Sequence, residues 1–132
     1  MIYFLDTNTC IFHLNGSAPK LSNLLEHTPP ASIRIPAMVA AELIYGAEKS
    51  MKREYNLEKA KLFLSLYEIV PFDASAAQLY GAIRCSLERG GEIIGGNDLV
   101  IAATVLAGNG TLVTNNTGEF SRVSGLQVED WS

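Results

Sequence analysis

The stretch that decides the fold is the first ten residues, MIYFLDTNTC (Met1–Cys10). Four apolar residues, 2–5, lead directly into Asp6, which is followed by three small polar residues. The apolar run indicates a buried strand, and the polar residues indicate a turn into a helix capped by Thr7 or Asn8. A carboxylate at the end of a buried strand costs several kcal/mol unless it is paired, hydrogen-bonded or bound to a cation. Asp6 is therefore the first candidate functional residue.

Strands and helices are predicted to alternate along the whole chain. The predicted strands cover 2–5, 32–35, 67–72, 111–113 and 126–128. The predicted helices begin near residues 8, 19, 36, 53, 76 and 97, and a short helical turn is predicted at 119–120. This alternation favours an α/β domain with a mostly parallel sheet, in which ligands bind beyond the carboxyl ends of the strands. The 132 residues are expected to form one domain, 1–132.

Composition and charge exclude several classes of protein. The chain is 48% hydrophobic and 18% charged, with 14 acidic and 10 basic residues and a net charge of -4. An acidic balance is not typical of a protein that binds nucleic acid by charge alone. No apolar run is long enough to cross a membrane, and no basic region precedes the first apolar stretch, so no membrane association is expected and the predicted location is cytoplasmic.

The cysteines and histidines do not form a reactive pattern. Cys10 and Cys85 are expected to be reduced and buried in helices, as in most cytoplasmic proteins of this size. His13 and His27 both fall in the first quarter of the chain, without a nucleophile signature beside them. The spacing of these four residues fits no zinc site. Nucleophilic catalysis through cysteine or histidine is therefore disfavoured.

Four of the acids sit at element ends or inside apolar segments: Asp6, Glu42, Asp98 and Glu119. Each has an ordinary structural explanation when taken singly, as a turn residue, a helix cap or a surface group. Gathered together without an equal number of basic partners, they would repel one another unless a divalent cation neutralised them. Such oxygen ligands suit Mg²⁺ or Mn²⁺, and the chemistry that fits them best is phosphodiester hydrolysis by metal-activated water.

Five motifs in order resemble a known family. They are LDTN at 5–8, AAELIYGAEKS at 40–50, NDLVIAA at 97–103, LVTNNTGEF at 112–120 and LQVEDWS at 126–132. This series resembles the PIN-domain ribonucleases and, more closely, the VapC toxins of bacterial type II toxin–antitoxin modules. The resemblance spans the whole chain. It implies a PIN-like α/β/α sandwich whose central, mostly parallel sheet has four to five strands.

The resemblance also implies roles for the acids. Asp6 and Asp98 match the principal metal ligands, and Glu42 matches the third acid of the catalytic group. The fourth position is open between Glu119 and Asn116, because some members carry an aspartate where this chain has Asn116. The implied cofactor is Mg²⁺, with Mn²⁺ as the alternative.

Two supporting residues and two departures from the family pattern follow from the same motifs. Thr114 is expected to position the end of the fourth strand, and Asn8 to tie the loop after the first. Gly118 stands where the relatives carry a basic residue, which removes one RNA-phosphate contact. The pair Gly95-Gly96 replaces a Gly-Pro, so the start of the following helix is expected to be looser.

The implied function is that of an endoribonuclease toxin acting on transfer or ribosomal RNA. A VapB-type antitoxin would neutralise it by laying an amphipathic segment into a groove of the helical pair within 36–66. The family forms homodimers, so a homodimer is expected. Lys49, Lys52 and Arg53 are candidate RNA contacts, although a solvated charge run explains each of them as well.

Two other functions remain open. A phosphatase of the haloacid-dehalogenase type also begins with an apolar strand, but its DxDxT motif is altered here because Asn8 replaces the second aspartate. It would act on small phosphoesters. A catalytically impaired PIN scaffold or binding module would explain Asn116 in place of a fourth aspartate, but not the presence of the other acids.

Overall fold

Five short parallel strands form the centre of the computed structural model, which describes residues 1–132. They are β1 (Tyr3–Leu5), β2 (Ile33–Pro36), β3 (Glu68–Val70), β4 (Thr111–Val113) and β5 (Gln127–Glu129). Their order in the sheet is β3-β2-β1-β4-β5, and every neighbouring pair is parallel. Strands β2 and β3 lie on one side of β1, and the chain then crosses over to place β4 and β5 on the other side. The switch point between β1 and β4 is where ligands bind in sheets of this kind.

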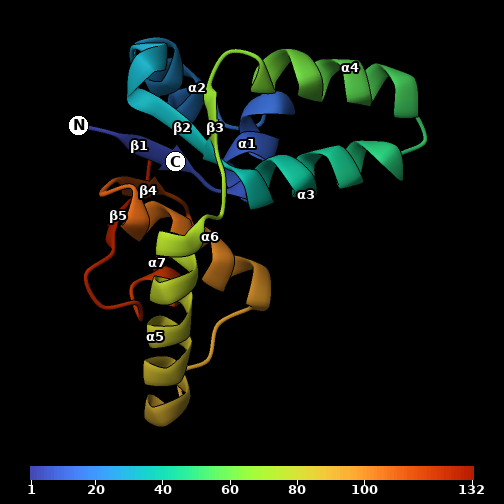
Figure 1. Ribbon diagram of the computed structural model, residues 1–132. Coiled ribbons are helices and arrows are strands. Elements are labelled where there is room, and N and C mark those ends of the chain that lie inside the picture. The colour runs from blue at the N-terminus through green and yellow to red at the C-terminus, as the bar shows by residue number, and fades with distance from the viewer.

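Seven α-helices surround the sheet. They are α1 (Thr7–Leu14), α2 (Pro19–Glu26), α3 (Ala37–Glu48), α4 (Arg53–Leu64), α5 (Ala74–Gly90), α6 (Gly96–Ala107) and α7 (Thr117–Phe120), with a 3₁₀ turn at Pro30–Ser32. Helices α3 and α4 form a hairpin that extends away from the sheet, and α5 extends away from it in a different direction beside α6 (Figure 1). The arrangement confirms the predicted α/β/α sandwich.

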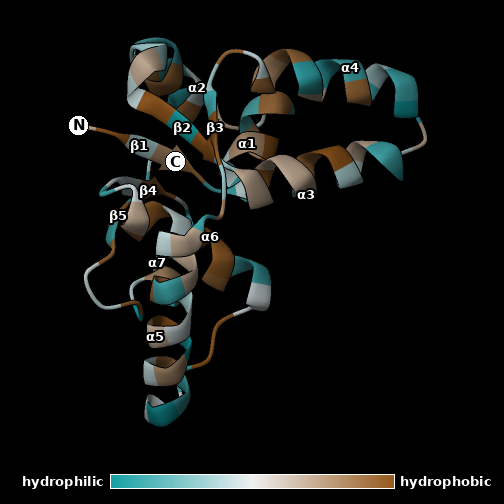
Figure 2. Cartoon of the chain, in the orientation of Figure 1, coloured by the Kyte–Doolittle hydropathy of each residue, from teal (hydrophilic) through white to brown (hydrophobic).

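The core lies between the sheet and the helices that cover it. Phe4, Ile35 and Leu112, from three neighbouring strands, are fully buried. Helix α6 is apolar along most of its length and carries a continuous buried run from Ile101 to Val105. Hydrophobic colour gathers on the strands and α6, whereas the far ends of α4 and α5 are more hydrophilic (Figure 2). A rigid apolar layer therefore supports the polar ends of β1 and β4.

The sequence predictions were right about most elements and wrong at several points. All five strands are present, although β3 is shorter than the predicted 67–72. Asp6 itself caps α1, in place of Thr7 or Asn8, because its side chain accepts a hydrogen bond from the helix. Cys10 is buried as expected, but Cys85 is exposed on α5. No helix has both the length and the apolar character needed to cross a membrane.

Candidate active site

The carboxylate of Asp6 is 4% exposed and is held by two hydrogen bonds at the end of β1. Its Oδ1 accepts from the backbone N–H of Thr9 at 2.9 Å, and its Oδ2 accepts from the hydroxyl of Thr114. These bonds explain how the end of a buried strand tolerates an acid. An ionised carboxylate has about four lone-pair positions, so two acceptor positions are left for a ligand.

The polar residues that follow Asp6 fix the loop and reach distant parts of the chain. The hydroxyl of Thr9 donates to the carbonyl of Val113 at 3.1 Å and so connects α1 to the end of β4. The hydroxyl of Thr7 donates to Glu42 at 2.6 Å. Asn8 is exposed and makes no such bond, so the predicted role of Asn8 in tying this loop was wrong. Thr7 and Thr9 hold the loop instead, because their side chains point inward from the first turn of α1.

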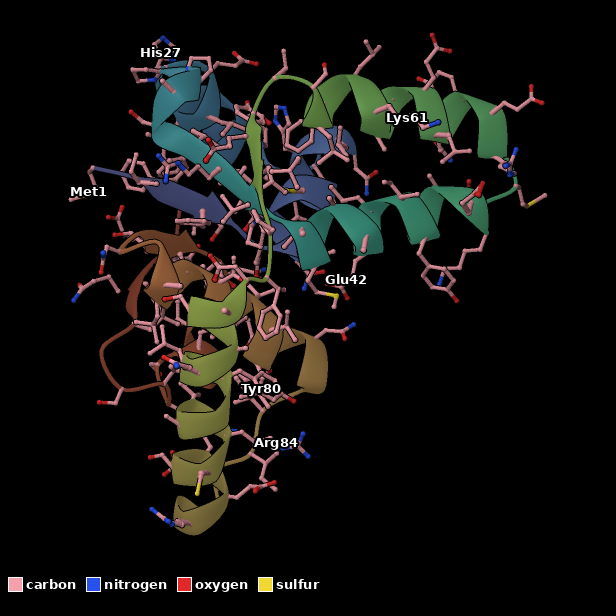
Figure 3. All side chains as sticks on the ribbon, in the orientation of Figure 1. Met1, His27, Glu42, Lys61, Tyr80 and Arg84 are labelled. Atoms are coloured by element: carbon pink, nitrogen blue, oxygen red, sulfur yellow. The ribbon has the colours of Figure 1, made fainter.

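Glu42 sits between three elements. It lies on α3, on the side of the helix that faces α6 (Figure 3). Oε1 accepts from Thr7 in α1, and Oε2 accepts from the side-chain amide of Asn97 at 3.2 Å. The neighbouring Leu43 is buried, which anchors this turn of α3 and directs the carboxylate toward the start of α6.

Asp98 is half-buried in the first turn of α6 and faces the other acids. Burial raises the pKa of Asp98 to about 7, with further contributions from a hydrogen bond to Glu119 and from repulsion by the carboxylates of Glu119, Glu42 and Asp6. The ionised form of Asp98 is therefore unfavourable in the protein alone. A cation bound among these carboxylates would reverse that preference.

Glu119 is engaged at both oxygens. Oε1 accepts from the backbone N–H of Gly95 at 2.9 Å, and Oε2 accepts from the side-chain amide of Asn116 at 2.8 Å. These two bonds are the main reasons that the pKa of Glu119 is lowered, so this carboxylate is ionised beside Asp98. The bond to Gly95 also ties down the loop before α6, which the glycine pair was expected to leave loose.

Thr114 occupies the predicted position at the end of β4. It is fully buried, and its hydroxyl both donates to Asp6 and accepts from the backbone N–H of Asn116 at 2.9 Å. The backbone N–H of Thr114 donates to Glu129 of β5 at 3.0 Å. The residue thus connects the two sides of the switch point and holds Asn116 next to Glu119.

None of the four acids forms an ion pair, and Arg122 is the basic residue that helps to lower the pKa of Glu119. The three ion pairs of the structure lie elsewhere and join Arg34 to Glu68, Arg53 to Glu48 and Arg84 to Glu88. In the structure, no three Asp, Glu, Cys or His side chains are arranged closely enough to form a metal site. The donor chemistry nevertheless fits a divalent cation, because the oxygens are hard ligands and no ion pair neutralises Asp6, Glu42 or Asp98. Asp6, Glu42 and Asp98 are the residues that suit this role.

A cleft of about 240 Å³ borders the acids on one side. It runs between α1, α3 and α4, and Glu42 stands at its edge. Its apolar lining includes Ile11, Leu14 and Leu43. The cleft therefore leads from an apolar surface directly to a carboxylate of the candidate site.

Comparison with known proteins identifies the family. A family model for the PIN domain matches residues 3–126. Ribonuclease VapC2 of Rickettsia felis is 46% identical over 132 residues, which cover 99% of this chain and 98% of that protein. This chain is a VapC-type member of the PIN-domain family. The tRNA(fMet)-specific endonuclease VapC of Shigella flexneri is 39% identical over 98% of each chain.

A solved structure confirms the fold of this VapC-type chain. This chain is similar to a crystal structure of VapBC2 from Rickettsia felis bound to a DNA fragment from their promoter. The TM-score is 0.94, with 45% identity over 100% of both chains. The family resemblance of the five motifs and the predicted parallel sheet are both confirmed. The assignment of individual metal ligands stays a prediction.

Sequence reasoning found the acids of the site and missed several of the groups that hold them. Thr7 was considered only as a helix cap, and Thr9 and Asn97 were not assigned roles, although the three residues bond to Glu42, Asp6 or β4. A signal for Asn97 existed, because it is polar, precedes Asp98 and lies where a helix begins. Nothing in the sequence indicated that Thr7 would bond to a residue 35 positions away.

Proposed function

We propose that this chain is an endoribonuclease toxin that hydrolyses RNA phosphodiester bonds with Mg²⁺ or Mn²⁺ at Asp6, Glu42 and Asp98. The observation that carries the proposal is that four acids from separate elements meet at the switch point. Burial, and then the hydrogen bond and the repulsion from the other acids, raise the pKa of Asp98 to about 7. Family membership supports the same activity, because the related chains are named ribonuclease or endonuclease.

The protein's own residues prepare the site for this chemistry. When bound, a divalent cation supplies the acidity that activates water and the positive charge that offsets the phosphate. Hydrogen bonds from Thr9 and Thr114 hold the carboxylate of Asp6 in a fixed orientation. Glu119 acts differently, because both of its oxygens are occupied by Gly95 and Asn116. We assign Glu119 to holding the loop that presents Asp98, and Asn116 to orienting Glu119.

Transfer RNA is the substrate class that we propose. The VapC proteins of Shigella flexneri and Salmonella typhimurium are named as tRNA(fMet)-specific endonucleases and are 39% and 37% identical to this chain. Ribosomal RNA, which the sequence left open, is the alternative outcome when cleavage sites are mapped.

We also propose a VapB-type antitoxin as the partner. The similar structures from Rickettsia felis and Salmonella typhimurium are VapBC complexes. In this chain the cleft between α1, α3 and α4 suits an amphipathic segment, because half of its lining residues are apolar and the others include polar residues and Glu42. A basic side chain of that segment would pair with the acids and displace the cation. The expected homodimer remains part of this proposal.

The test is cleavage of total tRNA and ribosomal RNA by the purified protein with Mg²⁺, with Mn²⁺ and with EDTA. We expect discrete cuts that require metal. Asp6→Asn is the matched variant, since it removes one charge while it keeps the size and one acceptor of the side chain. Cuts that persist in EDTA, or equal cleavage by wild type and Asp6→Asn, would refute the proposal. A protein that binds no metal and cuts no RNA would support a scaffold, and release of phosphate from small phosphoesters would support a phosphatase.

A further inference from the structure

One face of α3 leads from the candidate active site to the tip of the helical hairpin. Glu42, Tyr45 and Lys49 follow one another at spacings of three and four residues, so their side chains share this face. At a helical rise of about 1.5 Å per residue, Tyr45 and Lys49 lie roughly 4.5 Å and 10 Å along the axis from Glu42. Figure 3 places Glu42 on the side of α3 that faces the start of α6.

Tyr45 has no role in the core. Its side chain is 63% exposed, and no hydrogen bond holds its hydroxyl. Its ring is in contact with a cation, because the Nζ of Lys49 lies 4.7 Å from the ring centroid. Lys49 forms no ion pair. The two residues therefore present an aromatic face and an unpaired positive charge together, next to a catalytic acid.

The outer part of the hairpin, residues 48–61, also differs in charge from the rest of the molecule. Residues 48–61 contain five of the ten basic residues but only three of the 14 acids, which gives this segment a charge of +2. The remainder of the chain carries -6. A polyanion that approaches the acids is therefore attracted to the hairpin and repelled elsewhere. This charge complementarity favours nucleic acid over an acidic peptide of arbitrary sequence, because the aromatic ring adds a stacking surface.

We propose that Tyr45 and Lys49 form a subsite for the single-stranded RNA next to the scissile bond. An unpaired base stacks on the ring of Tyr45, and the adjacent phosphate contacts the ammonium of Lys49. The substrate segment must be single-stranded, because a base within a duplex cannot offer its face to the ring. The subsite rests on the proposed ribonuclease function, and it contributes to substrate binding while the acids carry the chemistry.

The test measures KM and kcat separately for the wild type and the variants. The substrate is a labelled RNA stem-loop that contains a cleavage site first mapped on total tRNA. Loss of one stacked base raises KM roughly 5- to 100-fold. We expect this rise for Tyr45→Ala with kcat within about twofold, and a KM near the wild-type value for Tyr45→Phe. Tyr55→Ala is the matched control, since Tyr55 is also 63% exposed but lies on α4. It should leave KM unchanged.

The salt dependence of KM tests the contact with phosphate. Removing one phosphate contact from a single strand lowers the slope of log affinity against log salt concentration by about 0.7. Lys49→Ala should show this loss, whereas Lys61→Ala, which removes the same charge from α4, should show less than half of it. Equal slopes for the two variants would mean that Lys49 acts only through the general charge of the hairpin.

An abasic substitution in the RNA identifies the stacked base. At one position next to the cut, removal of the base should raise KM for the wild type and have no further effect on Tyr45→Ala. Wild-type cleavage together with an unchanged KM for Tyr45→Ala would overturn the subsite and leave the ribonuclease function intact. A wild type that cleaves no RNA would overturn both. A lower molar mass for Tyr45→Ala by light scattering would show that a second copy of the chain covers this face instead.

Discussion

Burial, together with the neighbouring acids, makes the ionised form of Asp98 unfavourable in the folded protein. The pKa of Asp98 is raised to about 7, from an ordinary value of 3.8. The folded protein therefore holds a proton that the unfolded chain has already released between about pH 4 and pH 7. Without metal, the stability of the fold falls as the pH rises through this window, because the ionised carboxylate of Asp98 is unfavourable in the folded protein.

Asp98→Asn should abolish cleavage and stabilise the protein at the same time. The amide keeps the size of the side chain and removes the repelled charge, so the free energy of unfolding at pH 7.5 without metal should rise by about 1–2 kcal/mol. Urea unfolding at pH 7.5 and pH 5.5 measures this. The gain should shrink at pH 5.5, where the wild-type carboxyl is protonated. The lowered pKa of His13 acts in both proteins and cancels in the comparison. A variant that is less stable at pH 7.5 would show that Asp98 is a structural cap.

Thr114 is predicted to matter for the stability of the fold. Thr114→Val keeps the shape of the side chain but leaves Asp6 and the backbone N–H of Asn116 without their partner. Unsatisfied buried groups of this kind cost about 1–3 kcal/mol, measured as a lower free energy of unfolding. Thr114→Ser retains the hydroxyl and should recover most of the loss. A serine variant that is less stable than the valine variant would mean that packing of the methyl group, and not the hydroxyl, is what counts.

At the scale of elements, the connection from α6 to β4 depends on a close approach to β1. A side chain at Gly110 would overlap the ring of Phe4, which is fully buried beneath it. Gly110→Ala should therefore lower the free energy of unfolding by about 1–3 kcal/mol, because the core cannot expand freely. Thermal denaturation measures the effect. Gly81→Ala is the control, since open space surrounds Gly81 within α5. It should stabilise the protein by about 0.5–1 kcal/mol.

The elements themselves could be predicted from local patterns, and the contacts between them could not. Apolar runs and helical spacing identified all five strands because burial repeats with the period of the backbone. The acids were found because charge is unusual in such surroundings. The partners of Glu42 lie 35 and 55 residues away, at Thr7 and Asn97, and no local pattern encodes these pairs. Asn8 was misjudged because the sequence does not say which of three adjacent polar side chains points inward.

At the scale of the whole molecule, the site is assembled from elements that are far apart in the sequence. Asp6 follows β1, Glu42 lies on α3, Asp98 begins α6 and Glu119 lies on α7. The parallel order of the sheet brings these segments to one end of β1 and β4. The acids at this end of the sheet lie beside the outer part of the α3–α4 hairpin, residues 48–61, which carries a charge of +2.

The most direct test of this account is a calorimetric titration of the purified protein with Mn²⁺ at pH 7.5, beside Asp6→Asn and Asp98→Asn. If acids from separate elements share one metal site, the wild type binds Mn²⁺ and each variant alone loses most of the affinity, although both remain folded by circular dichroism. Binding that is unchanged in either variant would contradict a shared site. Absence of binding by the folded wild type would contradict the central claim that these acids are gathered to hold a cation.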